Sequence, residues 1–441
     1  MIRRVIAGLH GAVADWPARC VVGLLVLLSV VAVRNAFTYP AVLGFDAAEH
    51  LTYAHDLVHQ WRIPHGVGAF YTPPLFYLLA GSANALGESL GMAHPEQLGQ
   101  LFDAILCIAT ALLVVMLAKV LFPARRWLPV FALAALMAVP TVLKTAAMFH
   151  PQNLVVFLTT AAVLVLSRMI VRDRFGIVWA VSLGLLVGLA QLTRSVGVWV
   201  FGISLIALAL VFVARKSERR AVGRTVAIVL VLGVLIPAPW YYHLQHSYNS
   251  AVLGRPGPSL PQRRPSLGFY FNSGLPETVS APQRRDLARD FFPILYADSF
   301  GDYFGNWSWG PPIHNTLSKS LNRRLVEQSV VGIPLSLVLV AGWFGLAALA
   351  VVRWRQRLEL AAVALMPLAA LTGMLYYATR SPSSDGDTVK GLFALPAIPF
   401  LAIASAWLLD TLRGRLPRLA MLVVLATLGV ALVVSLEFVW W

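Results

Sequence analysis

The sequence predicts an all-α, polytopic membrane protein with about eleven transmembrane helices and interfacial helices in its first outer loop. Three observations predict this class. Of the 441 residues, 58% are hydrophobic and only 12% are charged, whereas a soluble chain carries about 25% charged residues. The apolar residues gather in runs of ~20, the length that crosses a bilayer as a helix. Lys and Arg gather in short clusters between those runs, which is the pattern that orients membrane proteins.

The predicted spans lie near 18–36, 97–121, 127–147, 153–171, 175–193, 197–214, 225–243, 328–352, 358–377, 392–410 and 418–438. The stretch 73–90 is apolar as well, but it begins with two prolines and carries Asn84 and Glu88. We interpret it as a helix that lies in the membrane interface. Counting it as a span would invert the orientation of every later one.

The basic clusters fit an N-terminus in the cytoplasm. The predicted cytoplasmic segments then hold Arg3-Arg4, Lys119 with Arg125-Arg126, Arg168 to Arg174, Arg215-Lys216 with Arg219-Arg220, Arg353 to Arg357, and Arg413 to Arg418. This is the positive-inside pattern, and the Arg-rich loop of 244–327 does not break it, because long loops translocate largely regardless of charge. We therefore predict a multi-pass protein of a bacterial-type plasma (inner) membrane, with a retained first span rather than a removed signal peptide. We attribute the net charge of +15 to the basic clusters that orient the protein in the membrane, and we predict no nucleic-acid partner.

Three parts follow from this topology. They are an N-terminal membrane module of 1–243 with a first outer loop of 37–96, a long extracytoplasmic loop of 244–327, and C-terminal transmembrane helices in 328–441. No Gly-rich phosphate loop of the nucleotide-binding kind is present. A protein that works outside the cytoplasm without a nucleotide needs an energised substrate there, and a lipid-linked donor meets that need. Cys20 and Cys107 lie in apolar runs, so we interpret them as small hydrophobic side chains.

A charged patch stands where the first span ends. Asp46, Glu49 and His50 lie within five residues of one another, and ionisable groups at a membrane edge are expensive, so they are default candidates for function. Asp46 also stands where it would cap a helix of 47–60. Glu49 and His50 follow one turn later and could share a face with it, either to support a base or as a solvated helix face.

Several segments resemble a known family. The first loop holds Asp46-Ala-Ala-Glu-His-Leu-Thr-Tyr-Ala54 and then Tyr71-Thr-Pro-Pro-Leu-Phe-Tyr-Leu-Leu-Ala-Gly81. It resembles the first loop of GT-C fold glycosyltransferases, in particular the protein-mannosyltransferase and aminoarabinose-transferase-like group (family 39-like). Later segments resemble that group in the same order, and they are Gly188 to Arg194, Pro237 to Tyr242, Tyr296 to Phe304, and Lys390 to Pro399. The resemblance covers most of the chain.

The resemblance implies a GT-C-like fold and a glycosyltransferase of the EC 2.4 class. It would move a sugar from a polyprenyl-phosphate donor to a lipid, glycan or protein acceptor on the extracytoplasmic face. It assigns Asp46 as the base that takes the acceptor's proton, with Glu49 as a second catalytic candidate. The chemistry agrees, because a hydroxyl or amine nucleophile needs a positioned base.

This sequence departs from the family at two places. Many members carry Glu where this chain has Ala47, and many carry an acidic residue in the second outer turn, where this chain has His150-Pro-Gln-Asn153. No cofactor is therefore certain. A divalent metal ion stays an open alternative, with unknown ligands, and His150 could replace the missing acid.

The remaining candidates would bind substrate. A donor phosphate needs cations, and Arg194, Arg380 and Lys390 stand at predicted outer ends, where Arg suits a phosphate fork and Lys a point charge; the alternative is snorkelling toward lipid headgroups. The other substrate-binding candidates are His50, Tyr71, His150, Asn153 and Asp302. Asp385-Gly386-Asp387 looks like a metal motif, but its Ser/Gly-rich context favours a turn.

A second class of function stays open. The chain could be a flippase or transporter of a lipid or lipid-linked sugar, without glycosyl transfer. Such proteins often show internal repeats and charges buried in mid-span. No clear repeat is visible here, and the charges cluster at the predicted outer edge, so the transferase is favoured.

Overall fold

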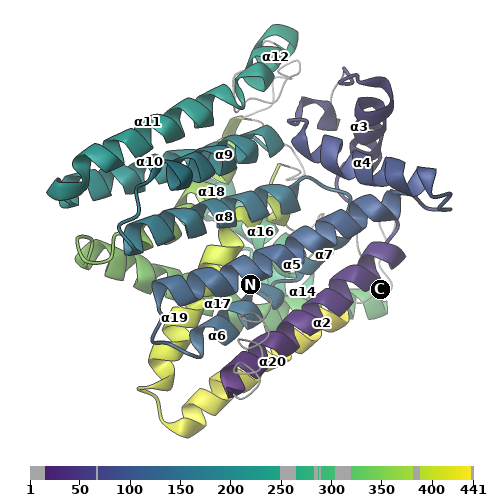
Figure 1. The fold of residues 1–441 in the computed structure, drawn as a ribbon. Helices are drawn as coiled ribbons and strands as arrows, with labels where there is room; N and C mark the ends of the chain where they lie inside the picture. The colour runs from purple at the N-terminus through teal and green to yellow at the C-terminus, as the bar shows by residue number, and fades with distance from the viewer. Residues whose placement is uncertain are drawn as a thin grey trace.

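The computed structural model describes residues 15–65, 68–248, 265–282, 287, 290–302, 319–380 and 388–438. Every regular element in these ranges is helical (Figure 1). The elements are α2 (Trp16–Thr38), α3 (Ala47–Gln60), η1 (Gly68–Tyr71), α4 (Leu75–Ser89), α5 (Glu96–Leu121), α6 (Leu128–Met137), α7 (Pro140–Ala147), α8 (Gln152–Val171), α9 (Ile177–Thr193), α10 (Gly197–Ala214), η2 (Lys216–Glu218), α11 (Arg219–Leu235), α12 (Ala238–Tyr248), α13 (Leu267–Phe271), α14 (Leu275–Ser280), α16 (Phe291–Phe300), α17 (Lys319–Val352), α18 (Leu360–Arg380), η3 (Gly391–Ala397), α19 (Ile398–Arg413) and α20 (Arg418–Phe438).

These helices confirm the prediction of an all-α polytopic membrane protein. Within the described ranges, nine helical segments are long and apolar enough to cross a bilayer, and the bent pair α6–α7 makes a tenth if it is one span. The shorter apolar helix α9 stands at the remaining predicted span. Each of the eleven predicted runs thus has a helical counterpart.

One predicted span, 127–147, is not a straight helix. Its two halves, α6 and α7, meet at an angle of 62°. Pro140 begins α7, and Val139 before it is extended, with φ −88° and ψ 107°. A proline disfavours helical backbone in the residue that precedes it, so the helix breaks there. The break turns the short helix α7, with Lys144, toward α16 and η3, which it contacts.

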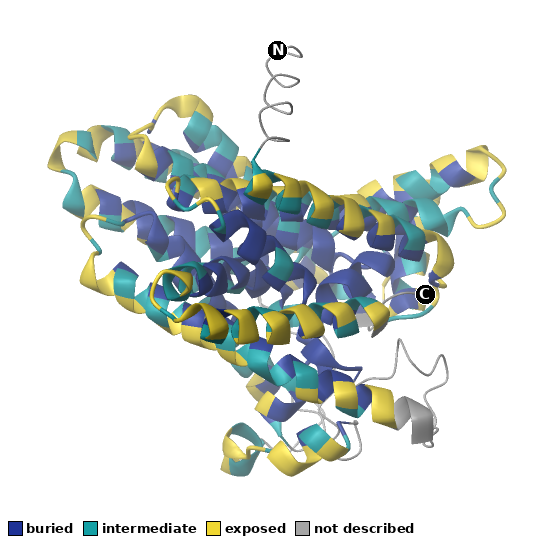
Figure 2. Cartoon of the chain, turned by 90° about the horizontal axis from the view of Figure 1, so that it is seen from below, coloured by how far each residue is buried: buried dark blue, intermediate teal, exposed yellow. Residues whose placement is uncertain are grey.

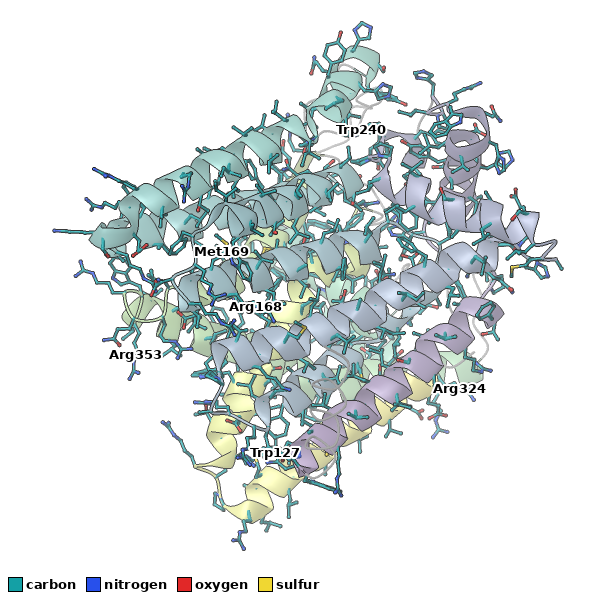
Figure 3. All side chains as sticks on the ribbon, in the orientation of Figure 1. Trp127, Arg168, Met169, Trp240, Arg324 and Arg353 are labelled. Carbon is teal, nitrogen blue, oxygen red and sulfur yellow. The ribbon has the colours of Figure 1, made fainter. Side chains whose placement is uncertain are left out.

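The segments predicted to be cytoplasmic gather at one end of the bundle. In Figure 3, Trp127 and Arg353 are labelled at the end opposite to α3, α4 and α12. Arg357 Nη2 donates to the carbonyl of Leu121 at 2.9 Å, and Arg125 Nη1 donates to Thr411 Oγ1 at 2.8 Å. Arg357 therefore pairs with a carbonyl of the last turn of α5, where terminal carbonyls lack helical partners, and Arg125 joins the segment before α6 to the last turn of α19.

The first outer loop folds into two helices at the other end. α3 packs on α4, α4 packs on α5, and α4 lies across the bundle ends rather than along them (Figure 1). Gln100 fixes the junction, because its buried amide donates to the carbonyls of Tyr39 at 2.8 Å and Ala147 at 2.7 Å. This arrangement agrees with the interpretation of 73–90 as a helix that does not span.

The core lies between the helices, and the outer faces are apolar. Buried residues fill the interior of the bundle, while exposed ones line its outer helices (Figure 2). Several exposed side chains are large and hydrophobic, such as Val26 at 57% and Val433 at 62% exposure. Apolar surface of this extent is expected where a protein faces lipid.

Candidate functional site

Asp46 occupies a strained position at the start of α3. Its backbone is left-handed, with φ 54° and ψ 24°, a conformation that costs a non-glycine residue about 1 kcal/mol or more. Its side chain makes no capping hydrogen bond to the helix. Asp46 thus stands at the capping position, but its carboxylate does not cap the helix. Residues with a strained backbone of this kind gather at functional sites.

The tight turn before Asp46 depends on a glycine. Gly44 has φ +112°, and a Cβ there would meet the Met148 side chain at 2.2 Å. The first loop therefore presses against the segment that joins α7 to α8. This contact brings the turn of 149–153 next to α3, where the rings of His50 and His150 meet.

Lys390 faces Asp46 from the far end of the chain. Its Nζ lies 3.8 Å from Asp46 Oδ2, and its side chain is only 10% exposed against 51% for Asp46. Its ammonium also lies 5.0 Å from the centre of the Phe45 ring. An aromatic face and a carboxylate both stabilise a cation, so a positive charge is held beside the exposed carboxylate.

A buried aspartate holds the backbone next to Lys390. Gly391 donates its N–H to Asp298 Oδ2, and a Cβ on Gly391 would meet the Ser299 nitrogen at 2.8 Å. Burial, opposed by this hydrogen bond, raises the pKa of Asp298 to about 7. α16 of the long outer loop is thereby joined to the start of η3.

His50 lies beneath Asp46 and points inward. Its Nδ1 is 2.7 Å from the Tyr77 hydroxyl, and its side chain is buried. Burial lowers its pKa to about 3, against the opposite effect of the Asp46 carboxylate. Arg194 and Lys390 lower it further, which places both cations near the ring. His50 is therefore a neutral hydrogen-bonding group at ordinary pH.

His150 packs edge-on against His50, with ring centres 4.7 Å apart. Its backbone N–H donates to Asp103 Oδ2 at 3.1 Å, and its Nδ1 accepts from the N–H of Gln152 at 3.2 Å. Burial lowers the pKa of His150 as well. A buried carboxyl group, that of Asp103 on α5, therefore lies next to the second outer turn, and the sequence motifs did not single it out.

Two predicted residues bind backbone groups, and a third is buried. Glu49 Oε2 accepts the N–H of Ala69 at 2.5 Å, so it anchors η1 rather than joining Asp46. Asn153 donates to the carbonyl of Thr145 at 2.9 Å. Asp302 is buried.

The expected motif around Asp302 is only partly described. Its last residues, Tyr303 and Phe304, lie outside the described residues, as does Asp385-Gly386-Asp387. Lys144 donates to the carbonyl of Gly301, so α7 contacts the described end of this motif. Arg380 ends α18 and is exposed, and none of the described contacts joins it to Asp46 or Lys390.

A large apolar cavity opens beside this cluster. It encloses about 1030 Å³, its mouth included, and it is lined by Tyr71, Thr72, Pro73, Arg194, Ser195, Val196, Trp199, Leu244, Met366, Ala370, Gly373, Met374, Tyr376, Tyr377, Phe393 and Pro396. Most of these side chains are apolar or aromatic. Of the described residues in its wall, Arg194 alone is charged, and its guanidinium stands 5.6 Å from the centre of the Phe393 ring. The predicted residues Tyr71 and Arg194 thus share one cavity.

The fold is that of the GT-C membrane glycosyltransferases, by likeness to solved structures. The apo oligosaccharyltransferase from Archaeoglobus fulgidus is 12% identical over 96% of this chain and 56% of its own, with a TM-score of 0.57. The same enzyme, AglB, in complex with an inhibitory peptide and a dolichol-phosphate, is 12% identical over 97% and 56%, with a TM-score of 0.56. ArnT from Cupriavidus metallidurans bound to undecaprenyl phosphate is 17% identical over 90% and 61%, with a TM-score of 0.48.

These likenesses extend to part of each larger chain. This protein spans 56% of the oligosaccharyltransferase and 61% of ArnT. No family model and no curated protein matches the chain. The GT-C fold predicted from the first-loop motif is confirmed by the solved structures.

Sequence reasoning missed the cavity wall. Trp199 on α10 and Met374 and Tyr377 on α18 line it, yet in the sequence they look like any residues of an apolar span. Tyr77 was quoted only as part of a motif, although it is the partner of His50. The nearest signal in the sequence is the pair Ala370 and Gly373, small residues that leave room on α18.

Proposed function

We propose that this chain is a glycosyltransferase that takes a sugar from a polyprenyl-phosphate donor on the extracytoplasmic face of a plasma membrane. One observation carries the proposal. An apolar cavity headed by Arg194 opens beside Asp46 and Lys390. An isoprenoid chain fits apolar walls, and a phosphate fits the space between Arg194 in the cavity wall and Lys390 beside Asp46.

The reaction uses the site in one displacement. An acceptor hydroxyl or amine attacks the anomeric carbon, the bond from that carbon to the phosphate oxygen breaks, and polyprenyl phosphate leaves. Asp46 takes the acceptor's proton, because its carboxylate is half exposed and therefore within reach of an acceptor. Lys390 and Arg194 stabilise the charge that grows on the leaving phosphate. The acceptor is a lipid, a glycan or a protein.

The orientation of this site follows the basic clusters. The Lys/Arg-rich segments lie at the end of the bundle opposite to α3, α4 and α12 (Figure 3). With those clusters in the cytoplasm, the N-terminus is cytoplasmic and the cavity mouth is outside. The AglB structure supports the donor class, because it contains a dolichol-phosphate.

The residues around Asp46 do not fit a divalent metal. Among the described residues, no three His, Cys, Asp or Glu side chains come together to hold one. Glu49 is engaged by the N–H of Ala69, and the Lys390 ammonium lies 3.8 Å from the Asp46 carboxylate. A cation there repels a metal ion. One oligosaccharyltransferase structure contains Zn and sulfate, but we route no step of this reaction through a metal.

Removal of metal ions is therefore expected to leave sugar transfer unchanged. Lys390 supplies the positive charge that a metal would otherwise supply at the phosphate. The measurement is the transfer rate in vesicles before and after treatment with EDTA, and then after addition of Mg²⁺, Mn²⁺ or Zn²⁺. A rate that EDTA abolishes and a single metal restores would contradict the assignment.

The test of the function itself uses vesicles that contain the purified protein. A panel of radiolabelled polyprenyl-phosphate sugars is supplied with membrane extract as a source of acceptors, and the transferred or released sugar is measured. Ala370→Phe, which fills the cavity from α18, is expected to raise the donor KM about tenfold or more, because overpacking costs about 1–3 kcal/mol. Leu368→Phe is the matched control, since Leu368 on the same helix is 47% exposed.

Two outcomes would contradict the transferase. One is no release or transfer from any donor of the panel. The other is movement of the donor lipid across the bilayer without transfer, which would favour a flippase. If Ala370→Phe and Leu368→Phe change the donor KM equally, the proposal that the donor binds in the cavity is wrong.

A further inference from the structure

A second cluster of rings lies where the first outer loop meets α12. It consists of His65, Trp240, His243 and Tyr248. The His65 ring centre is 6.1 Å from that of His243 and 6.4 Å from that of Tyr248, and the His243 and Tyr248 centres are 6.0 Å apart. Trp240 stacks obliquely on His243 at 5.1 Å. We call these four side chains the ring cluster.

The ring cluster holds buried polar atoms without partners. Trp240 Nε1, His243 Nε2 and Tyr248 OH are all buried, and none has a hydrogen-bond partner among the residues that the structure describes. Trp240 as a whole is only 3% exposed. Buried polar atoms are nearly always paired, so three orphans in one cluster need an explanation, such as a ligand that pairs with them.

An aromatic belt at the membrane interface does not explain the cluster. Belt residues present their rings to lipid headgroups, as Tyr242 does on the same helix, with 72% exposure and its ring stacked on His246 at 5.9 Å. Trp240 instead lies on the inner side of α12, between that helix and the α3–α4 pair (Figure 3). α12 therefore carries an outward ring pair as well as three rings of the cluster, of which Trp240 is buried and His243 and Tyr248 are half-buried; His65, from the first outer loop, is exposed.

The cluster adjoins the mouth of the cavity. Leu244, the residue after His243, lines the cavity together with Tyr71 and Thr72. A ligand held by the cluster would thus reach the same mouth as a group bound near Arg194. The side chains of the cluster carry no carboxylate, and they offer ring faces together with neutral donors and acceptors.

We propose that the ring cluster is a subsite for an uncharged pyranose ring. Aromatic faces pack on the C–H face of a sugar, while the indole N–H, the imidazole nitrogen and the phenol pair with its hydroxyls. The sugar is the glycosyl unit of the donor or a residue of a glycan acceptor. This inference rests on the proposed function, but sugar binding is measured without any transfer.

The first experiment measures binding alone. Uncharged methyl pyranosides are titrated into the purified, detergent-solubilised protein, and saturation-transfer NMR reports the bound fraction. Tyr248→Phe and Trp240→Phe each remove one polar group and keep a ring. Each is expected to weaken binding of the best pyranoside about three- to tenfold, the effect of one lost hydrogen bond. Tyr242→Phe is the matched control and is expected to bind as the native protein does.

The outcomes decide both the site and the source of the sugar. The proposal is overturned if no pyranoside binds saturably, or if Tyr242→Phe weakens binding as much as Tyr248→Phe. In transfer assays, a raised donor KM in Tyr248→Phe assigns the subsite to the donor sugar, and a raised acceptor KM assigns it to a glycan acceptor. Binding without any transfer would keep the subsite and refute the transferase.

Discussion

Asp46→Asn is expected to lower the rate of sugar transfer at least about a hundredfold, the effect of losing a general base. The amide keeps the size of the side chain and tolerates the left-handed backbone of this position, with φ 54°, because Asn and Asp share that tolerance. It cannot accept the acceptor's proton. Binding of the donor is expected to persist, since Arg194 and Lys390 are unchanged.

The measurement is single-turnover transfer in vesicles, with donor binding measured separately. Asp56→Asn is the matched control, because Asp56 lies on the same helix and its described contacts, with His55 and Gln60, are local. Equal rates for Asp46→Asn and the native protein would move the base elsewhere. Glu49 is then the next carboxylate to test, although its engagement with Ala69 argues against it.

The spans could be predicted from the sequence, because lipid imposes their length and their apolar composition. A run of apolar residues such as 197–214 has no alternative to a helix in a bilayer, and α10 begins at Gly197 and ends at Ala214. The bend at Val139 was missed, although its cause is visible in the sequence as Pro140. A proline at that depth was treated as part of a continuous span.

The sequence singled out site candidates only where a motif marks them. Asp46 and Lys390 were both singled out, but nothing in the sequence shows that their charges lie 3.8 Å apart, because that contact depends on how distant helices pack. Glu49 was predicted beside Asp46, and its carboxylate binds backbone instead. Cavity walls such as Trp199 follow the same apolar pattern as lipid-facing residues, so periodicity alone does not separate them.

Lys390→Gln is expected to lower kcat/KM for the donor about a hundredfold or more. Losses of this size follow when an enzyme loses one preorganised group that stabilises developing charge. The side chain is 10% exposed, so water does not replace the lost charge. Lys390→Arg keeps the charge and is expected to recover only part of the activity, because the planar guanidinium spreads its charge whereas the lysine ammonium concentrates it at one point. Lys119→Gln, at the far end of α5, is the control for a lost surface cation.

Two roles for Lys390 give different kinetics. If the ammonium binds the donor phosphate, the donor KM rises, and Lys390→Gln and Asp46→Asn have largely additive effects on the barrier. If it only holds the Asp46 carboxylate in place, the loss falls on kcat, and the double variant is no slower than Asp46→Asn alone, because residues that act as a unit are not additive. We expect the first pattern. The cation is held over the Phe45 ring at 5.0 Å, and its backbone neighbour Gly391 is fixed by Asp298, so its position does not depend on Asp46.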